Sequence, residues 1–305
     1  PSSISAISGT ADDDYSGVNR VYVSVQIAPP TGNFWSGSGF GATTQYFNIC
    51  SGSTSWSYAG MSGWTDSEEY RVAIRVVDNS GNWSDVHSIK TFTYDTGNPA
   101  SAITLPVNNS FYNSTGINLI SGTSYDSLSG VSSVKVAILN RSINKWFDGA
   151  NFVGDSRQFF NVTSGTSPWY FNINTSKLVS GDEYLVQSYA LDNAEPPNSS
   201  LGESNFAVGV NSNVFTYDMA RPTTTIIQPA GNAFINASLA SITGTAEDET
   251  SGLSKVEISI SEDGGLWWDG FGFNSAVEMF HNASTGTLPG YWSYSGASFQ
   301  HGYAY

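Results

Sequence analysis

Apolar and polar residues alternate with a period of two in three well-separated runs of the chain. The runs are Val21, Val23 and Val25, then Val134, Val136 and Ile138, and then Val256, Ile258 and Ile260. Such alternation is typical of a β-strand with one face buried. Turn clusters of Gly, Ser, Asn and Asp separate the apolar runs, and no amphipathic helix of ten residues is evident. Short strands at regular spacing predict an all-β protein of the sandwich type.

Each alternating run follows a copy of the same ten-residue segment. The copies read GTADDDYSGV at 9–18, GTSYDSLSGV at 122–131 and GTAEDETSGL at 244–253, and they start 113 and 122 residues apart. Each run then leads to an aromatic pair and a glycine, in FWSG at 34–37, WFDG at 146–149 and WWDG at 267–270. A repeat of this length indicates tandem domains, which usually provide length, spacing or multivalency rather than a single reaction.

The middle repeat can be divided into seven strands. They are expected at 102–105, 117–122, 134–139, 146–152, 169–173, 184–190 and 214–217. Seven strands in about 120 residues fit an immunoglobulin-like β-sandwich. Trp169 and Tyr184 are expected in its core. Tyr70, Tyr184 and Tyr303 each follow a Gly or acidic turn, where a tyrosine corner would lie.

The repeats predict three modules with short junctions. They are residues 1–95, without a first strand; residues 96–218, complete; and residues 219–305, without the last strands. The junctions FTYD at 92–95 and 215–218 each precede a proline, which restricts the residue before it to extended conformations. We therefore expect stiff connections. Unpaired edges invite added strands, so the expected partners are further copies of the same module, in the same chain or in neighbouring chains.

Composition narrows the classes of partner. The 305 residues carry a net charge of −15 with only 11 Lys and Arg. This argues against nucleic acid, whose phosphates need cations, and against anionic lipid surfaces. No apolar run approaches the ~18 residues of a membrane-spanning helix, so membrane insertion is not expected. A single cysteine, Cys50, allows no internal disulfide. An acidic, Lys-poor surface is typical of exported proteins.

No constellation of catalytic residues is evident. His87, His281 and His301 lack partners at the spacing of a metal site or a catalytic triad. The G-x-S-x-G, phosphate-loop and HExxH motifs are absent. Because function must be argued from a site, the chain is not expected to be an enzyme, and no catalytic or cofactor-binding residue is assigned.

The acidic turns of the first and third repeats are the candidate metal sites. Their carboxylates belong to Asp12, Asp13, Asp14, Glu247, Asp248 and Glu249. Calcium takes several oxygens from adjacent loops, and the Asp78 loop could lie beside the first turn. We expect weak calcium sites at Asp13 with Asp78 and at Asp248 with its loop. The alternative is a solvated turn in which Asp caps its own backbone.

The second repeat departs from this acidic pattern. Tyr125 stands beside Asp126 where the other turns have a second acidic residue, and the loop after Asp192 lacks the glycine of its counterpart at 78–82. Both departures disfavour a calcium site in this repeat.

The aromatic pairs suggest a second kind of site. Trp146 and Phe147, with Trp267 and Trp268, could stack on the faces of sugar rings. Adjacent residues of a strand point to opposite faces, so one ring of each pair should be buried and the other at least partly exposed. Repetition in all three repeats favours packing as the main role of these rings.

The combined pattern resembles a known family. The chain combines a GTAxD–SGV turn, an alternating strand, a WWDG-like element, a W-S-Y strand, a tyrosine and a DNxxGN loop. This combination is similar to the bacterial immunoglobulin-like repeats of very large secreted or surface-anchored proteins. The resemblance covers essentially the whole chain. It implies an extracellular or cell-surface location, a stalk, filament or adhesive role, and no catalytic residues.

Three hypotheses of function follow. The first is a non-enzymatic structural segment of an extracellular stalk or filament. The second is an adhesin or glycan-binding module, with surface glycans as partners. The third is an accessory region of a secreted hydrolase whose catalytic domain lies elsewhere.

Overall fold

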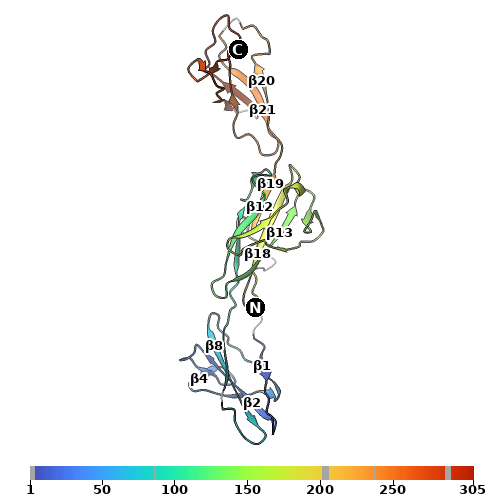
Figure 1. The fold of residues 1–305 in the computed structure, drawn as a ribbon, viewed down its shortest axis with the longest axis vertical. Coiled ribbons are helices and arrows are strands. Elements are labelled where there is room, and N and C mark those ends of the chain that lie inside the picture. The colour runs from blue at the N-terminus through green and yellow to red at the C-terminus, as the bar shows by residue number, and fades with distance from the viewer. Residues whose placement is uncertain (1–3, 86, 201–205, 236–237, 286–289) are drawn as a thin grey trace.

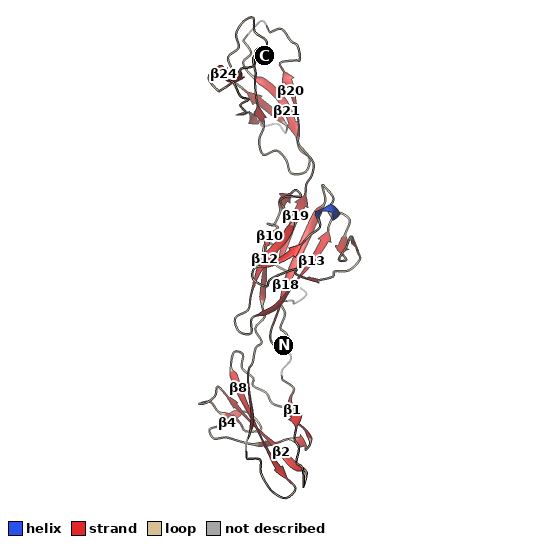
Figure 2. Ribbon diagram, in the orientation of Figure 1, coloured by secondary structure: helices blue, strands red, loops and turns tan. Residues whose placement is uncertain are grey.

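The computed structural model describes residues 4–85, 87–200, 206–235, 238–285 and 290–305. The described residues form strands and one short 3-10 helix, η1, at Thr175–Lys177 (Figure 2). Three β-sandwich modules follow one another along the long axis of the molecule (Figure 1). We call them module 1 (β1–β9), module 2 (β10–β19) and module 3 (β20–β27). The chain is thus all-β, with tandem immunoglobulin-like modules.

Module 1 contains two sheets. The larger has the order β4-β3-β2-β8-β9, with β5 also pairing with β2, and the smaller has the order β1-β7-β6. The strands are β1 Ala6–Thr10, β2 Val18–Ile27, β3 Phe34–Trp35, β4 Phe40–Ala42, β5 Asn48–Ile49, β6 Ser51–Gly52, β7 Ser55–Ala59, β8 Glu69–Asp78 and β9 Ser88–Thr93.

Module 2 repeats this plan with additional strands. One sheet has the order β10-β12-β17, and the other has the order β11-β19-β18-β13-β14-β15, with β16 pairing with β13. The strands are β10 Ala100–Leu105, β11 Ser110–Tyr112, β12 Leu119–Tyr125, β13 Val131–Asn140, β14 Lys145–Phe147, β15 Phe152–Gly154, β16 Phe160–Asn161, β17 Trp169–Asn172, β18 Glu183–Asp192 and β19 Ser212–Tyr217. Every expected segment contains strand residues, but the segment expected at 146–152 is two strands, β14 and β15, which pair with each other. Strands β11 and β16 lie outside the expected segments.

Module 3 contains one larger sheet and two small ones in its described residues. The order of the larger sheet is β20-β21-β27-β26, and the pairs β22-β25 and β23-β24 stand apart from it. The strands are β20 Thr223–Gln228, β21 Ile242–Glu247, β22 Glu257–Ile258, β23 Trp267–Trp268, β24 Phe273–Ser275, β25 His281–Asn282, β26 Ser284–Thr285 and β27 Tyr291–Tyr294.

Each module has its own hydrophobic core, and the three alternating apolar runs form part of these cores. In module 2, Trp169 and Tyr184 are both 0 % exposed, as the sequence predicts. The hydroxyl of Tyr184 accepts a hydrogen bond from the Val179 N–H, five residues earlier. Tyr70 does the same with Thr65 in module 1. These are tyrosine corners, whereas Tyr303 is mostly exposed.

The repeated glycine of the GT segment is explained by a buried tryptophan. A Cβ on Gly122 would lie 2.2 Å from the Trp169 ring, and a Cβ on Gly244 would lie 2.4 Å from the Trp292 ring. Gly9 meets Trp56 in the same way in module 1. The indole lies against the backbone of the neighbouring strand, so a side chain at the glycine position would collide with it.

In the described part of the chain, no helix has the length and apolar character needed to cross a membrane.

Candidate functional site

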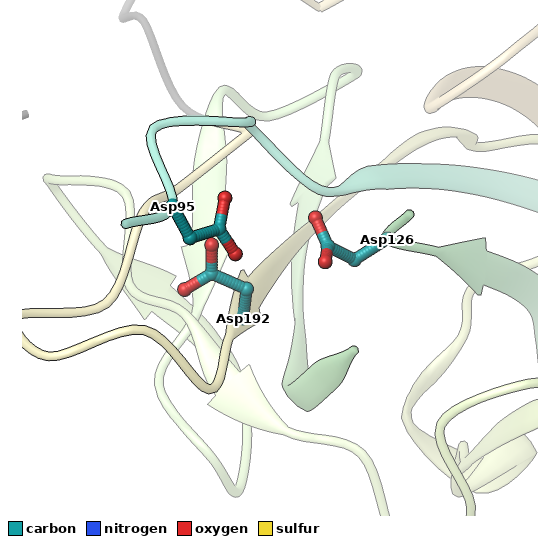
Figure 3. A group of neighbouring side chains, drawn as sticks. All are labelled: Asp95, Asp126 and Asp192. Carbon is teal, nitrogen blue, oxygen red and sulfur yellow. The ribbon is translucent and has the colours of Figure 1, made fainter. Parts of the chain in front are cut away.

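Three carboxylates meet where module 1 joins module 2. Asp95 comes from the junction after β9, Asp126 from the turn after β12, and Asp192 from the end of β18. One oxygen of each lies within 4.8 Å of the others (Figure 3). Asp192 is fully buried, and the other two are half-buried. This group is called the junction cluster below.

Backbone N–H groups orient two of these carboxylates. Asp126 Oδ1 accepts hydrogen bonds from the N–H groups of Leu128 and Gly130, which shape the turn. Asp192 accepts bonds from the N–H groups of Ala194 and Asn198, and from the Asn198 side chain at 2.8 Å. The turn and the loop are therefore held by their own aspartates.

Asp95 and the residue after it tie the junction to both modules. Asp95 Oδ2 accepts a hydrogen bond from the Ser129 N–H, and its carbonyl accepts one from the Asn198 side chain. The next residue, Thr96, donates from its N–H and its hydroxyl to Asp66 of module 1, at 2.6 and 2.8 Å. These bonds hold the pKa of Asp66 below its ordinary value, the Thr96 N–H contributing most. The junction is thus bonded on both sides.

The chemistry of the junction cluster suits a hard cation. Calcium takes six to eight oxygens at 2.3–2.6 Å, and the three carboxylates could supply three of them. Without a cation, three negative charges at this separation repel one another. The N–H donors on each carboxylate offset part of that repulsion.

The carboxylates that the sequence singled out are arranged differently. Asp13 Oδ1 accepts bonds from the N–H groups of Tyr15, Ser16 and Gly17. Asp248 has the same pattern with its own turn. The pKa of Asp13 is lowered chiefly by the Gly17 N–H, and that of Asp248 chiefly by the Ser251 N–H. Both side chains therefore cap their own backbone.

The Asp78 loop lies beside the first turn, as expected. Asn79 donates from its N–H and its side chain to the Gly17 carbonyl. Asp78 itself accepts bonds from Ser80 and Asn82, and the Asn82 side chain contributes most to lowering its pKa. The remaining candidates are exposed: Asp12, Asp14, Glu247 and Glu249. In the described residues, none of the proposed carboxylates gathers into a group of three like the junction cluster.

Sequence reasoning missed the junction cluster for a definite reason. The turn and loop of the second repeat depart from the acidic pattern, and this departure disfavours a calcium site there. Nevertheless Asn193 donates to the Gly130 carbonyl as Asn79 does to Gly17. The sequence analysis does not include Asp95 among the candidate metal ligands. The available signal is the FTYD segment, which ends in an aspartate at both junctions and indicates a shared role for that residue.

The aromatic pairs divide between core and surface. Trp268 is 2 % exposed, and its indole N–H donates to the Tyr294 hydroxyl at 2.9 Å, while Trp267 is half-buried. Trp35 and Tyr58 repeat this bond in module 1. The expected division into one buried and one partly exposed ring is confirmed there. In module 2 the expected division is wrong, because Trp146 and Phe147 are both half-buried.

Comparisons with known proteins give little beyond the fold. A scan against models of protein families finds no match, and a search of curated proteins also finds none. Among solved structures, the chain is similar to the fibronectin(III)-like modules of Clostridium thermocellum CbhA, at 14% identity and a TM-score of 0.37, over 70% of this chain and 84% of that one. It is also similar to the chicken CNTN1 FN1–FN3 domains, at 11% identity and a TM-score of 0.28, over 96% of this chain and 84% of that one. Neither likeness carries an argument about function.

Proposed function

We propose that this chain is a non-catalytic structural segment of an extracellular stalk or filament built of bacterial immunoglobulin-like modules. The observation that carries the proposal is the first junction. A flexible tether would leave its backbone polar groups to water, whereas Asp95 bonds to module 2 and Thr96 bonds to module 1. Junctions of this kind turn a row of modules into a stiff spacer.

The second junction is bonded to module 2. The N–H of Asp218 donates to the Tyr112 carbonyl, and the N–H of Met219 donates to the Ser180 hydroxyl. Asp218 is itself 8 % exposed. Both junctions therefore begin as extensions of a folded module, which supports an elongated arrangement.

Module 3 supports further copies of the module as the partner. Ile226 pairs with Gly244 as Ile103 pairs with Gly122 in module 2, so the two isoleucines are equivalent. Ile103 is 6 % exposed, whereas Ile226 is 61 % exposed. In module 2, β18 lies against β10 and completes the core. The open face of β20 would be covered by the corresponding strands of another copy.

Stiffness at the first junction can be measured directly. We would place spin labels at Thr44→Cys in module 1 and Val179→Cys in module 2, both in a Cys50→Ser background, and record the distance distribution by double electron–electron resonance. A single narrow distribution is expected, and Asp66→Ala should broaden it by releasing Thr96. Asp155→Ala, an exposed carboxylate away from the junction, is the matched control. A parent distribution as broad as that of Asp66→Ala would refute the stiff junction.

The exposed face of β20 in module 3 can be tested separately. Sedimentation velocity on residues 1–305 should show association that rises with concentration and falls in Ile226→Ser. Strictly monomeric behaviour at all concentrations would contradict the proposed partner.

A further inference from the structure

The outer face of the larger sheet of module 1 carries a small polar hollow. Val21, Val23 and Val25 of β2 point into the core, so the alternate residues of β2 and β8 face away from it. The hollow has a volume of about 60 Å³, several times the roughly 10–15 Å³ needed to admit one water molecule. It is lined by Ser24, Gln26, Phe34, Gln45, Arg71 and Ala73.

The floor of the hollow contains an unsatisfied donor. Ser24, Gln26 and Ala73 are 1 %, 4 % and 3 % exposed. The Gln26 amide donates to the carbonyls of Pro30 and Gly32. The Ser24 hydroxyl, in contrast, is buried with no hydrogen-bond partner among the described residues. A buried hydroxyl without a partner is costly, and a ligand oxygen in the hollow would satisfy it.

The wall of the hollow contains an unpaired cation. Arg71 lies directly across from Gln26 on the neighbouring strand. Within the described part of the chain no carboxylate forms an ion pair with it. In a protein of net charge −15, a half-buried guanidinium left without an acidic partner is available to an anion.

Module 2 shows the same place filled by its own side chains. Strand registers make Leu185 the counterpart of Arg71, Gln187 that of Ala73 and Arg157 that of Gln45. The Arg157 guanidinium donates to the Gln187 side chain at 3.2 Å and lies 5.9 Å from the Trp146 ring. The smaller residues of module 1 leave this space open and place the cation on its wall instead.

We propose that this hollow binds a carboxylate of a uronic-acid polysaccharide. A carboxylate is planar, is a small group for a hollow of about 60 Å³, and accepts paired N–H donors from a guanidinium. The Ser24 hydroxyl would donate to it from the floor. Phe34 at the rim supplies a flat apolar surface for the C–H face of the sugar ring. This inference goes beyond the stalk role, because its failure would leave the junction results unchanged.

The test uses the full 305-residue chain and a hexamer of galacturonate as the probe, titrated by isothermal calorimetry. Arg71→Leu removes the cation and Ala73→Gln fills the hollow, and both introduce the residue that module 2 has at that position. Each should weaken binding by about 10- to 100-fold, the range for hydrogen bonds to a charged group. The matched control is Lys90→Asn, which removes the same charge from exposed β9 and again introduces the module 2 residue, Asn213. It should leave the affinity within about twofold.

Further probes separate the sources of the carboxylate. A fully methyl-esterified hexamer should bind at least about tenfold more weakly, and so should a hexamer of glutamate, which lacks the sugar ring. No binding of the galacturonate hexamer would overturn the proposal. So would equal binding of the esterified hexamer, or an equal loss in Lys90→Asn, since either would remove the role of the carboxylate in the hollow. Equal binding of the glutamate hexamer would overturn the polysaccharide assignment in favour of a peptide. Circular dichroism of each variant checks that the fold is retained.

Discussion

Replacement of Trp169 by alanine tests whether the repeated Trp–Gly contact organises each module. The indole of Trp169 is fully buried in the module 2 core, and its N–H donates to the Thr123 carbonyl at 3.1 Å. Its ring also lies against Gly122. The substitution therefore removes a large apolar surface, one hydrogen bond and the packing between β12 and β17.

The magnitude follows from the buried area. A tryptophan buries about 150–250 Å², which at roughly 25 cal/mol per Å² corresponds to about 4–6 kcal/mol as an upper estimate. Measured Trp→Ala changes in cores are about 3–5 kcal/mol. We expect a loss within this range. Trp146→Ala, at a half-buried position, should cost less than half as much, because its ring keeps contact with solvent.

The assay is urea titration of a fragment spanning residues 95–218, followed by far-ultraviolet circular dichroism. Typical domains have unfolding free energies of about 5–15 kcal/mol, so the variant should still fold and show a lower midpoint. A loss below roughly 1 kcal/mol for Trp169→Ala, the usual scale of a surface change, would refute the assignment of this residue to the core. An equal loss for Trp146→Ala would also refute it.

Three further outcomes are expected. Gly122→Ala should destabilise module 2 by about 1–3 kcal/mol or more, the usual cost of overpacking a core, because the new Cβ would lie 2.0 Å from a backbone oxygen. An unchanged urea midpoint would be inconsistent with that contact. Millimolar calcium should raise the melting temperature of the 95–218 fragment, and Asp126→Asn should abolish this shift because it relieves the repulsion in the junction cluster. If neither calcium nor a chelator changes the melting temperature, a structural ion is excluded. The pKa values of Asp13 and Asp248 are lowered in the folded chain, so each carboxylate contributes stability above the unfolded carboxyl pKa near 4, and this stability is lost as the pH falls through the lower folded value. The melting temperature should therefore fall more steeply between pH 6 and pH 2 in the parent than in Asp13→Asn, and equal pH dependence in the two proteins would contradict this expectation.

The fold could be predicted from the sequence because its signals are local. Alternation marks which strand residues face the core, and a tyrosine after an acidic turn marks a corner, as Tyr70 and Tyr184 confirm. Strands β11 and β16 escaped prediction because each has only two or three residues. Such segments become strands only through the long neighbour with which they pair.

The sites could be predicted only in part, because they depend on contacts between distant residues. The turn at Asp13 and the loop at Asp78 were expected to lie together, and they do. Whether an aspartate faces outward or caps its own backbone depends on a few backbone angles that no residue pattern reports. The junction cluster needs Asp95 and Asp192, which are 97 positions apart. The hollow of module 1 exists because Gln45 and Ala73 are smaller than their module 2 counterparts, and these counterparts can be identified only from the strand registers.

Modules 1 and 2 have separate cores of the same plan but differ on the outer face of the larger sheet, and one cross-strand pair shows how. In module 1, Tyr22 of β2 pairs with Arg75 of β8, and the guanidinium lies 5.4 Å from the tyrosine ring. In module 2 the equivalent pair is Lys135 with Tyr189, so cation and ring have exchanged strands while remaining in contact at 6.0 Å. A cross-strand pair contributes through the contact of its two side chains, which does not depend on which strand supplies the charge. An outer face tolerates an exchange of this kind, whereas Gly122 is fixed by the core, since a Cβ on it would lie 2.2 Å from the Trp169 ring. The proposed spacer role depends only on the cores and junctions, and it leaves an outer face such as that of module 1 free to carry a binding site.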